Sequence, residues 1–116
     1  MAKLRATPKN YAEALAVLNG RGFMRLGNNT YLELLNGLQF IGVRLHNTYI
    51  VRFHENGTTT LHTGGYYTVT TKERINQLIA GRVFQTKGDW YYSLPIDYTA
   101  TDAQPVRREF TEGMEV

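Results

Sequence analysis

The feature that most constrains the fold is an alternation of apolar and polar residues between positions 23 and 62. Five segments in this range are rich in the β-branched and aromatic residues that favour strands: FMRL, TYLELL, LQFIGVRLH, TYIVRFH and TTTLH. Turn-forming residues separate them at Asn28-Asn29, Asn36-Gly37, Asn47 and Asn56-Gly57. The pattern predicts an antiparallel meander of four or five strands.

Side-chain chemistry predicts how two central strands pair, because a slip by one residue moves every side chain to the other face. A three-residue loop over residues 46–48 puts the apolar side chains of both strands on one face. These are Ile41, Val43, Leu45, Tyr49, Val51 and Phe53.

The next turn, ENG, also fits a three-residue loop, with Gly57 in the left-handed conformation. This loop places Leu61 opposite Val51, and it places Thr60 and His62 opposite Arg52 and Ile50 respectively. The opposite face of the sheet then carries a polar set, which is Arg44, Arg52, His54, Thr58, Thr60 and His62.

A first helix is predicted before the meander, over residues 8–19. Thr7 can cap it, Pro8 suits its first position, and Gly20 is a suitable stop. Apolar residues with helical spacing form one stripe, which consists of Tyr11, Ala14, Leu15 and Leu18.

A second helix is predicted near residues 71–80, where Thr70 and Glu73 make a capping box and Gly81 ends it. Its buried stripe is Ile75, Leu78 and Ile79. The hairpin RVFQT-KGD-WYYSL follows. The predicted fold class is α+β: an antiparallel sheet of four to five strands with an N-terminal helix, the second helix and a trailing hairpin. Residues 1–94 are expected to form a single domain, and residues 95–116 an extended or flexible tail.

Charge is distributed unevenly along the 116 residues, whose net charge is +3. Residues 95–116 carry a net −3, so the preceding 94 residues carry +6. A basic body with an acidic tail suggests an anionic partner, or a tail that docks on its own body or on a neighbour. The alternative is that the charge serves only solubility.

Several classes of function lack support in the sequence. There is no cysteine, and neither a signal peptide nor a membrane span is found, so a cytoplasmic protein with no membrane partner is expected. No motif for nucleotide-dependent or serine catalysis is present, so the chain is not expected to be an enzyme. Three histidines, His46, His54 and His62, do not converge on the predicted register, so no metal and no cofactor are expected.

One segment, HTGGYYTVTTKERIN over residues 62–76, combines the groups that a nucleotide pocket requires. Two glycines allow close backbone approach, tyrosine rings can stack on a base, and the N-terminus of a helix attracts anions. The candidate contacts in this segment are Tyr66, Tyr67, Thr70, Thr71, Lys72, Arg74 and Asn76. The equally weighted alternative is that the tyrosines fill the core and a threonine merely caps the helix.

Residues 43–92 resemble a segment of small bacteriophage proteins. The shared pattern is V-R-L-H-x-T, followed by G-G-aromatic-x-T-x-T-T-K-x-R-x-N and an aromatic strand. The segment is also similar to the phage sponge proteins that counter Thoeris defence. That resemblance implies an anti-defence protein that sequesters a cyclic nucleotide or cyclic ADP-ribose-type signal without cleaving it, as a dimer or higher homo-oligomer. It implies that Tyr66 and Asn76 contact the ligand and that the protein acts in the cytoplasm of an infected host cell. Arg44 and His46 are further candidate contacts, Arg44 because the polar face of the sheet could receive phosphates.

Two other functions remain open for this sequence. The tyrosines and basic groups also suit a small RNA- or DNA-binding protein, which would track many phosphates. A protein-binding inhibitor of a host defence system is the third hypothesis, although the sequence contains no specific sign of one. A homo-oligomer is further suggested by the aromatic hairpin around Trp90, Tyr91 and Tyr92.

Overall fold

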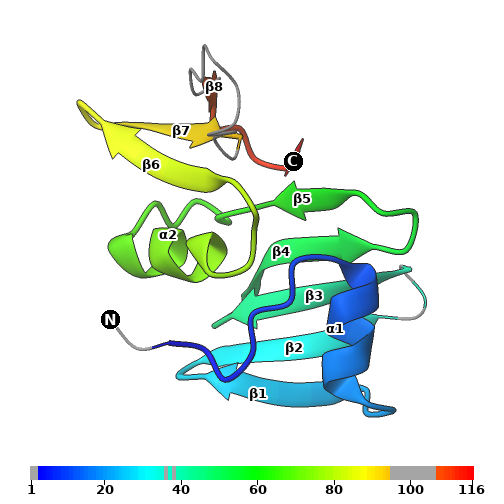
Figure 1. The fold of residues 1–116 in the computed structure, drawn as a ribbon. Coiled ribbons are helices and arrows are strands. Elements are labelled where there is room, and N and C mark those ends of the chain that lie inside the picture. The colour runs from blue at the N-terminus through cyan, green and yellow to red at the C-terminus, as the bar shows by residue number, and fades with distance from the viewer. Residues whose placement is uncertain (1–2, 36, 38, 95–106) are drawn as a thin grey trace.

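The α+β class is confirmed by the computed structural model, which describes residues 3–35, 37, 39–94 and 107–116. A six-stranded antiparallel sheet has the order β1-β2-β3-β4-β5-β9, and a three-stranded sheet has the order β6-β7-β8. Figure 1 shows α1 in front of the larger sheet and α2 between that sheet and the smaller one. The strands are β1 (Phe23–Gly27), β2 (Thr30–Leu35), β3 (Phe40–Leu45), β4 (Thr48–His54), β5 (Thr59–Leu61), β6 (Arg82–Thr86), β7 (Asp89–Ser93), β8 (Arg107–Glu109) and β9 (Met114–Glu115).

The C-terminal residues extend both sheets beyond the predicted meander. The first five strands form the meander in chain order, and β9 then pairs with β5 as a sixth strand. β8 pairs with β7 in the smaller sheet. Part of the predicted tail, residues 95–106, lies outside the described residues. The remainder, from residue 107, is tied to the body by these two short strands.

Helix α1 (Tyr11–Leu18) starts later than predicted. Asn10, not Thr7, caps it: the Asn10 side chain accepts from the Glu13 backbone N–H at 2.8 Å and donates to the Glu13 carboxylate at 3.1 Å. Leu18 is buried as expected, whereas Leu15 is 44% exposed. The buried stripe is therefore narrower than the spacing predicted.

The pairing of β3 with β4 matches the predicted register only away from the turn. Val43 lies opposite Val51, as expected. Nearer the turn the register shifts, so that Arg44 lies opposite Tyr49. The predicted three-residue loop is wrong: Leu45 and Thr48 pair across a two-residue turn, and a β-bulge in β4 takes up the extra residue.

The bulge exchanges two side chains between the faces of the sheet. Ile50, which the sequence analysis assigned to the other face, is buried in the core. Tyr49 instead points away from the core, where its hydroxyl donates to the Glu33 carboxylate at 3.1 Å. Burial, aided by this hydrogen bond, raises the pKa of Tyr49.

The pairing of β4 with β5 confirms the predicted three-residue loop. Gly57 has a φ of +97°, Leu61 lies opposite Val51, and Thr60 lies opposite Arg52. On the polar face, the Thr60 hydroxyl lies 3.0 Å from a ring nitrogen of His54 and 3.2 Å from one of His62.

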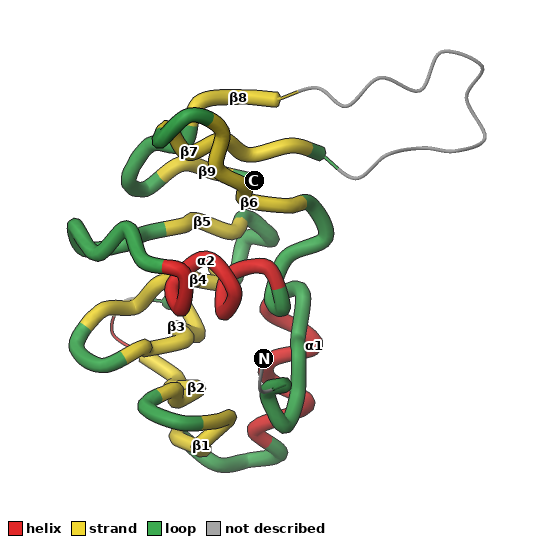
Figure 2. The backbone as a smooth tube through the Cα atoms, turned by 90° about the vertical axis from the view of Figure 1, so that its left-hand side faces the viewer, coloured by secondary structure: helices red, strands yellow, loops and turns green. Residues whose placement is uncertain are grey.

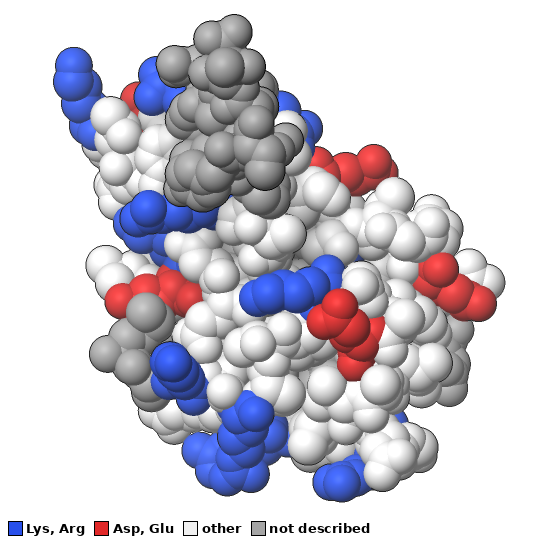
Figure 3. All heavy atoms as spheres, viewed as in Figure 1, with Lys and Arg blue, Asp and Glu red and all other residues white. Residues whose placement is uncertain are grey.

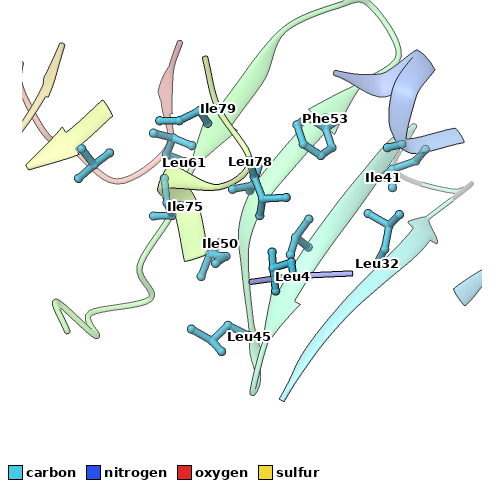
Figure 4. Close-up of a cluster of buried hydrophobic side chains, with 14 of the residues drawn as sticks. Leu4, Leu32, Ile41, Leu45, Ile50, Phe53, Leu61, Ile75, Leu78 and Ile79 are labelled. Carbon is cyan, nitrogen blue, oxygen red and sulfur yellow. The ribbon is translucent and has the colours of Figure 1, made fainter. Parts of the chain in front are cut away.

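Helix α2 (Val69–Asn76) begins two residues before the predicted start. Thr68 caps it, because its hydroxyl accepts from the Thr71 backbone N–H at 3.1 Å; the predicted capping box at Thr70 is wrong. The buried stripe is confirmed, although Leu78 and Ile79 lie just beyond the helix. Figure 4 shows how side chains of this region and of the sheet meet in one core.

The trailing hairpin turns more tightly than predicted. Thr86 pairs with Asp89, so the turn is Lys87-Gly88 alone. Both turn residues have positive φ, 53° and 85° respectively, as a type I′ turn requires.

Candidate functional site

The glycine pair in the predicted pocket segment brings this segment close to β4. Gly64 has a φ of +63°, and a Cβ atom added there would lie only 2.6 Å from Oγ1 of Thr48. A side chain at position 64 is therefore excluded both by backbone strain and by contact. The close backbone approach predicted for a ligand is in part an approach to the chain's own sheet.

The C-terminal region fixes the same segment from the other side. The Thr63 backbone N–H donates to the Glu112 carboxylate at 2.7 Å, and the Thr63 hydroxyl bonds to that carboxylate as well. The Gly65 N–H lies 3.4 Å from it. One acidic residue thus docks on the body of its own chain, which is one of the alternatives that the charge distribution left open.

Beyond the glycines, the side chains are exposed and the backbone enters α2. Tyr66 is 66% exposed, so it does not fill the core. Thr68 binds the N–H groups of Thr71 and Lys72 through its hydroxyl and carbonyl respectively. The N–H groups of the first two helical residues have no partner within the described part of the chain.

A cavity of about 510 Å³ lies between this segment and the turn that joins β3 to β4. Its volume falls in the range of small-molecule sites. In Figure 2, α2 lies in front of β4. One wall of the cavity comes from residues 45–50 and the other from residues 63–71. The lining residues are Leu45, His46, Asn47, Thr48, Ile50, Thr63, Tyr66, Thr68, Thr70 and Thr71.

The accessible surface of the lining is mostly apolar, although many of the lining residues carry hydroxyl groups. Five threonines line the cavity, together with one tyrosine, one histidine and one asparagine, and none of the lining residues is acidic. Leu45 and Ile50 are buried core residues and supply an apolar floor. Such a cavity can accept an aromatic ring against the tyrosine and polar ligand atoms at the hydroxyl groups, without repelling an anion.

Four of the nine predicted contacts come together in this cavity: His46, Tyr66, Thr70 and Thr71. His46 reaches it from the β3–β4 turn, where it has a φ of +54° and its N–H donates to the Asn29 carbonyl at 2.9 Å. The Thr71 hydroxyl is 3.0 Å from that of Thr68 and is almost completely buried.

Three other predicted contacts have structural partners away from the cavity. Arg44 pairs with Glu33, and this hydrogen bond raises the pKa of the Arg44 guanidinium. Arg74 is buried, and its Nε donates to the Thr30 hydroxyl at 3.2 Å. Their contribution to a ligand site stays a prediction.

Asn76 is the third of these, and its amide binds the backbone of β6. The amide oxygen accepts from the Val83 N–H at 2.7 Å, and the amide nitrogen donates to the Val83 carbonyl at 2.8 Å. The side chain thus acts as a substitute for a neighbouring strand on the edge of the smaller sheet.

The last two predicted contacts, Tyr67 and Lys72, face the smaller sheet. The Tyr67 ring meets Trp90 edge-on at a centroid separation of 5.0 Å. The Lys72 ammonium lies 5.4 Å above the Trp90 ring and 3.3 Å from the Gln85 amide oxygen. Of the nine predicted contacts, four therefore line the first cavity, two face the smaller sheet, and three have structural partners elsewhere.

Sequence reasoning missed most of the β3–β4 side of the cavity. Asn47 and Thr48 line it because the turn is one residue shorter than predicted. The motif V-R-L-H-x-T, which spans this turn, was the one signal that could have located it. Within the described residues, no cluster of three or more metal-binding side chains is found.

Comparisons with known proteins give one match. A family model described as "Kyanoviridae Gp96 protein" matches residues 8–116. No curated protein and no solved structure matches the chain. None of the described helices is long and apolar enough to cross a membrane.

Proposed function

We infer a small-molecule-binding function for this chain, which belongs to the Kyanoviridae Gp96 family of bacteriophage proteins. The ligand that we propose is a cyclic nucleotide or cyclic ADP-ribose-type signal, held in the cavity between the β3–β4 turn and the start of α2 and sequestered without cleavage. Such a protein would protect the phage against a host defence that uses the signal.

The observation that carries this proposal is the exposed Tyr66 side chain in the lining of a mostly apolar cavity that also contains five threonines. Because Tyr66 is 66% exposed, its ring buries little apolar surface in the free protein and is available to stack on a base. Thr70 lies beside it at the start of α2, where unpaired N–H groups and the helix dipole favour a phosphate. The absence of acidic residues from the lining is compatible with an anionic ligand.

One face of the molecule offers no continuous basic groove for a long nucleic acid. On the face drawn in Figure 3, basic side chains are separated by acidic and uncharged groups instead of following one groove. A ligand bound in one cavity releases few counterions, so its affinity should depend weakly on salt, whereas RNA or DNA binding should weaken steeply.

The direct test is calorimetric titration of the protein with cyclic ADP-ribose and with cyclic dinucleotides. A Tyr66→Ala variant should bind about 5- to 150-fold more weakly, because stacking on one base contributes about 1–3 kcal/mol. Its melting temperature should stay near that of the unchanged protein, since the ring is exposed. Phe23→Ala, which removes another exposed ring outside the cavity, is the matched control.

Two further measurements bear on sequestration. Chromatography after incubation should return the ligand unchanged. A linear or hydrolysed product would show that the protein is an enzyme and not a sponge. Mass spectrometry of small molecules released by heating the purified protein would identify the natural ligand. If no cyclic nucleotide binds and none is released, the proposal is wrong.

We also propose that the protein acts as a homo-oligomer. The exposed apolar residues of the described region, among them Leu15, Val69 and Leu94, are candidates for burial against a second copy. Light scattering at micromolar concentration should give a mass above that of one 13.3 kDa chain. A monomer mass would contradict this part of the proposal.

A further inference from the structure

A second cavity lies between the segment before α2 and the smaller sheet. Its volume is about 470 Å³, and it shares no lining residue with the first. Its accessible surface is mostly polar, and its lining includes three aromatic and three polar side chains: Tyr67, Trp90, Phe110, Gln85, Asp89 and Glu109.

The three aromatic rings stand nearly perpendicular to one another. Tyr67 meets Trp90 at a centroid separation of 5.0 Å and an interplanar angle of 86°, and it meets Phe110 at 6.1 Å and 85°. Trp90 and Phe110 are 5.6 Å apart at 68°. Tyr67 is 50% exposed, whereas Trp90 and Phe110 are each only 8% exposed, so the cavity meets the Tyr67 ring and small parts of the other two. The electron-rich faces of such rings attract a positive charge.

A cation of the chain itself already uses one of these rings. The Lys72 ammonium lies 5.4 Å from the Trp90 centroid, within the range of a cation–π contact. Its other contact is the Gln85 amide oxygen at 3.3 Å. Both contacts are near the outer limits for such interactions, so a better-fitting cation can replace the Lys72 side chain.

The charge of the rim also favours a cation. Asp89 and Glu109 are exposed, and neither forms an ion pair with any of the described residues. Two carboxylates beside three aromatic rings repel phosphate and attract an ammonium group. The second cavity thus has the opposite preference to the first, whose lining contains no acid.

We propose that this second cavity binds an organic cation of the alkylammonium class, which displaces Lys72 from Trp90. The aromatic rings contact the alkyl groups around the charge, and the two carboxylates balance it. This site goes beyond the proposed nucleotide site and does not depend on it.

The chain contains a single tryptophan, so its fluorescence reports on this cavity alone. We would titrate the protein with choline at constant ionic strength, and in parallel with the uncharged carbon analogue dimethylbutanol. Choline should change the Trp90 emission in a saturable way, at a concentration about fivefold or more below that needed for the analogue. Equal responses to the two compounds would show that the cavity binds apolar groups regardless of charge, and this result would overturn the proposal.

Charge variants make the test sharper. Lys72→Met removes the competing ammonium and should tighten choline binding about two- to fivefold, with little effect on dimethylbutanol. The double variant Asp89→Asn with Glu109→Gln should weaken choline binding by a similar factor. Glu55→Gln, which removes an exposed carboxylate in the β4–β5 turn, is the matched control and should change nothing. If the double variant binds choline as well as this control does, the carboxylates have no role and the proposed site is wrong.

The source of the ammonium group is tested with a second probe, N-acetyl-lysine amide, which represents a protein side chain. Binding of either probe supports the site, and their order of affinity indicates a free cation or a partner's lysine. Binding of neither would refute it. Tyr66→Ala should leave choline binding unchanged, so failure of the nucleotide site and failure of the cation site can be distinguished.

Discussion

Replacement of Asn76 by alanine should destabilise the protein, although the resemblance to sponge proteins predicts a loss of ligand binding alone. The Asn76 amide makes a pair of hydrogen bonds with Val83, at 2.7 and 2.8 Å. Val83 is almost completely buried and lies on β6, at the edge of the smaller sheet. Its outward-facing N–H and C=O therefore depend on this one side chain in place of a neighbouring strand.

The magnitude follows from the groups left without partners. A buried polar group that loses its hydrogen bond costs about 1–3 kcal/mol. Two such groups would cost about 2–6 kcal/mol, and entry of water at the edge strand reduces this toward the lower end. Alanine gains about 0.5 kcal/mol of helix propensity at the end of α2. The expected net loss is about 2–3 kcal/mol, which corresponds to a decrease of roughly 10 °C in the melting temperature.

Urea titration followed by circular dichroism measures this loss. Asn76→Asp keeps the oxygen that accepts from Val83, but it places a second carboxylate oxygen against the Val83 carbonyl, so the two acceptors repel and this variant should be no more stable than Asn76→Ala. A melting temperature within about 2 °C of the unchanged protein for Asn76→Ala would refute the reasoning. The amide would then be available for a ligand, as the motif suggests.

Three further predictions concern residues 62–65 and the contact of this segment with Glu112. Gly64→Ala should destabilise the fold by about 1–3 kcal/mol, measured by urea titration, because its Cβ would meet Thr48 at 2.6 Å; Gly65→Ala, where no atom lies within 4 Å, should cost less. Glu112→Gln should speed hydrogen exchange of residues 110–116, and unchanged exchange would show that its contacts do not hold the C-terminus. Burial, helped by a nearby arginine, lowers the pKa of His62, so protonation favours the unfolded chain and stability should fall as the pH decreases below about 6.5. His62→Gln should flatten that pH profile of the melting temperature, and an unchanged profile would contradict the assignment.

The sheet was largely predictable from the sequence because alternation constrains it at every residue. The β4–β5 register follows from side chains alone, and Gly57 sets its turn. The β3–β4 turn was predicted one residue too long, because a bulge changes the face of a side chain without changing the composition of the strand. A bulge has no local sequence signal when, as at Ile50, the extra residue is itself a good strand former.

The sequence predicted several residues that line one cavity, but not how the whole predicted set is arranged. Tyr66, Thr70 and His46 lie in the lining of that cavity, and their role as ligand contacts stays a prediction. Asn76 carries the same chemical groups that a base edge needs, yet its amide serves the β6 backbone. An amide side chain has the same donor and acceptor as a peptide group, so sequence cannot decide which of the two it replaces.

The sequence of the C-terminal residues has no clear periodicity, yet these residues support both cavities. They do so through contacts with residues that lie far away in the sequence. Glu112 holds Thr63, which lines the first cavity, while Phe110, two residues earlier, forms a wall of the second. The adjacent tyrosines Tyr66 and Tyr67 lie on opposite sides of this arrangement, one in each cavity. Residues 110–112 thus join the walls of both cavities through contacts with residues far away in the sequence, and no local pattern in the sequence indicates contacts of that range.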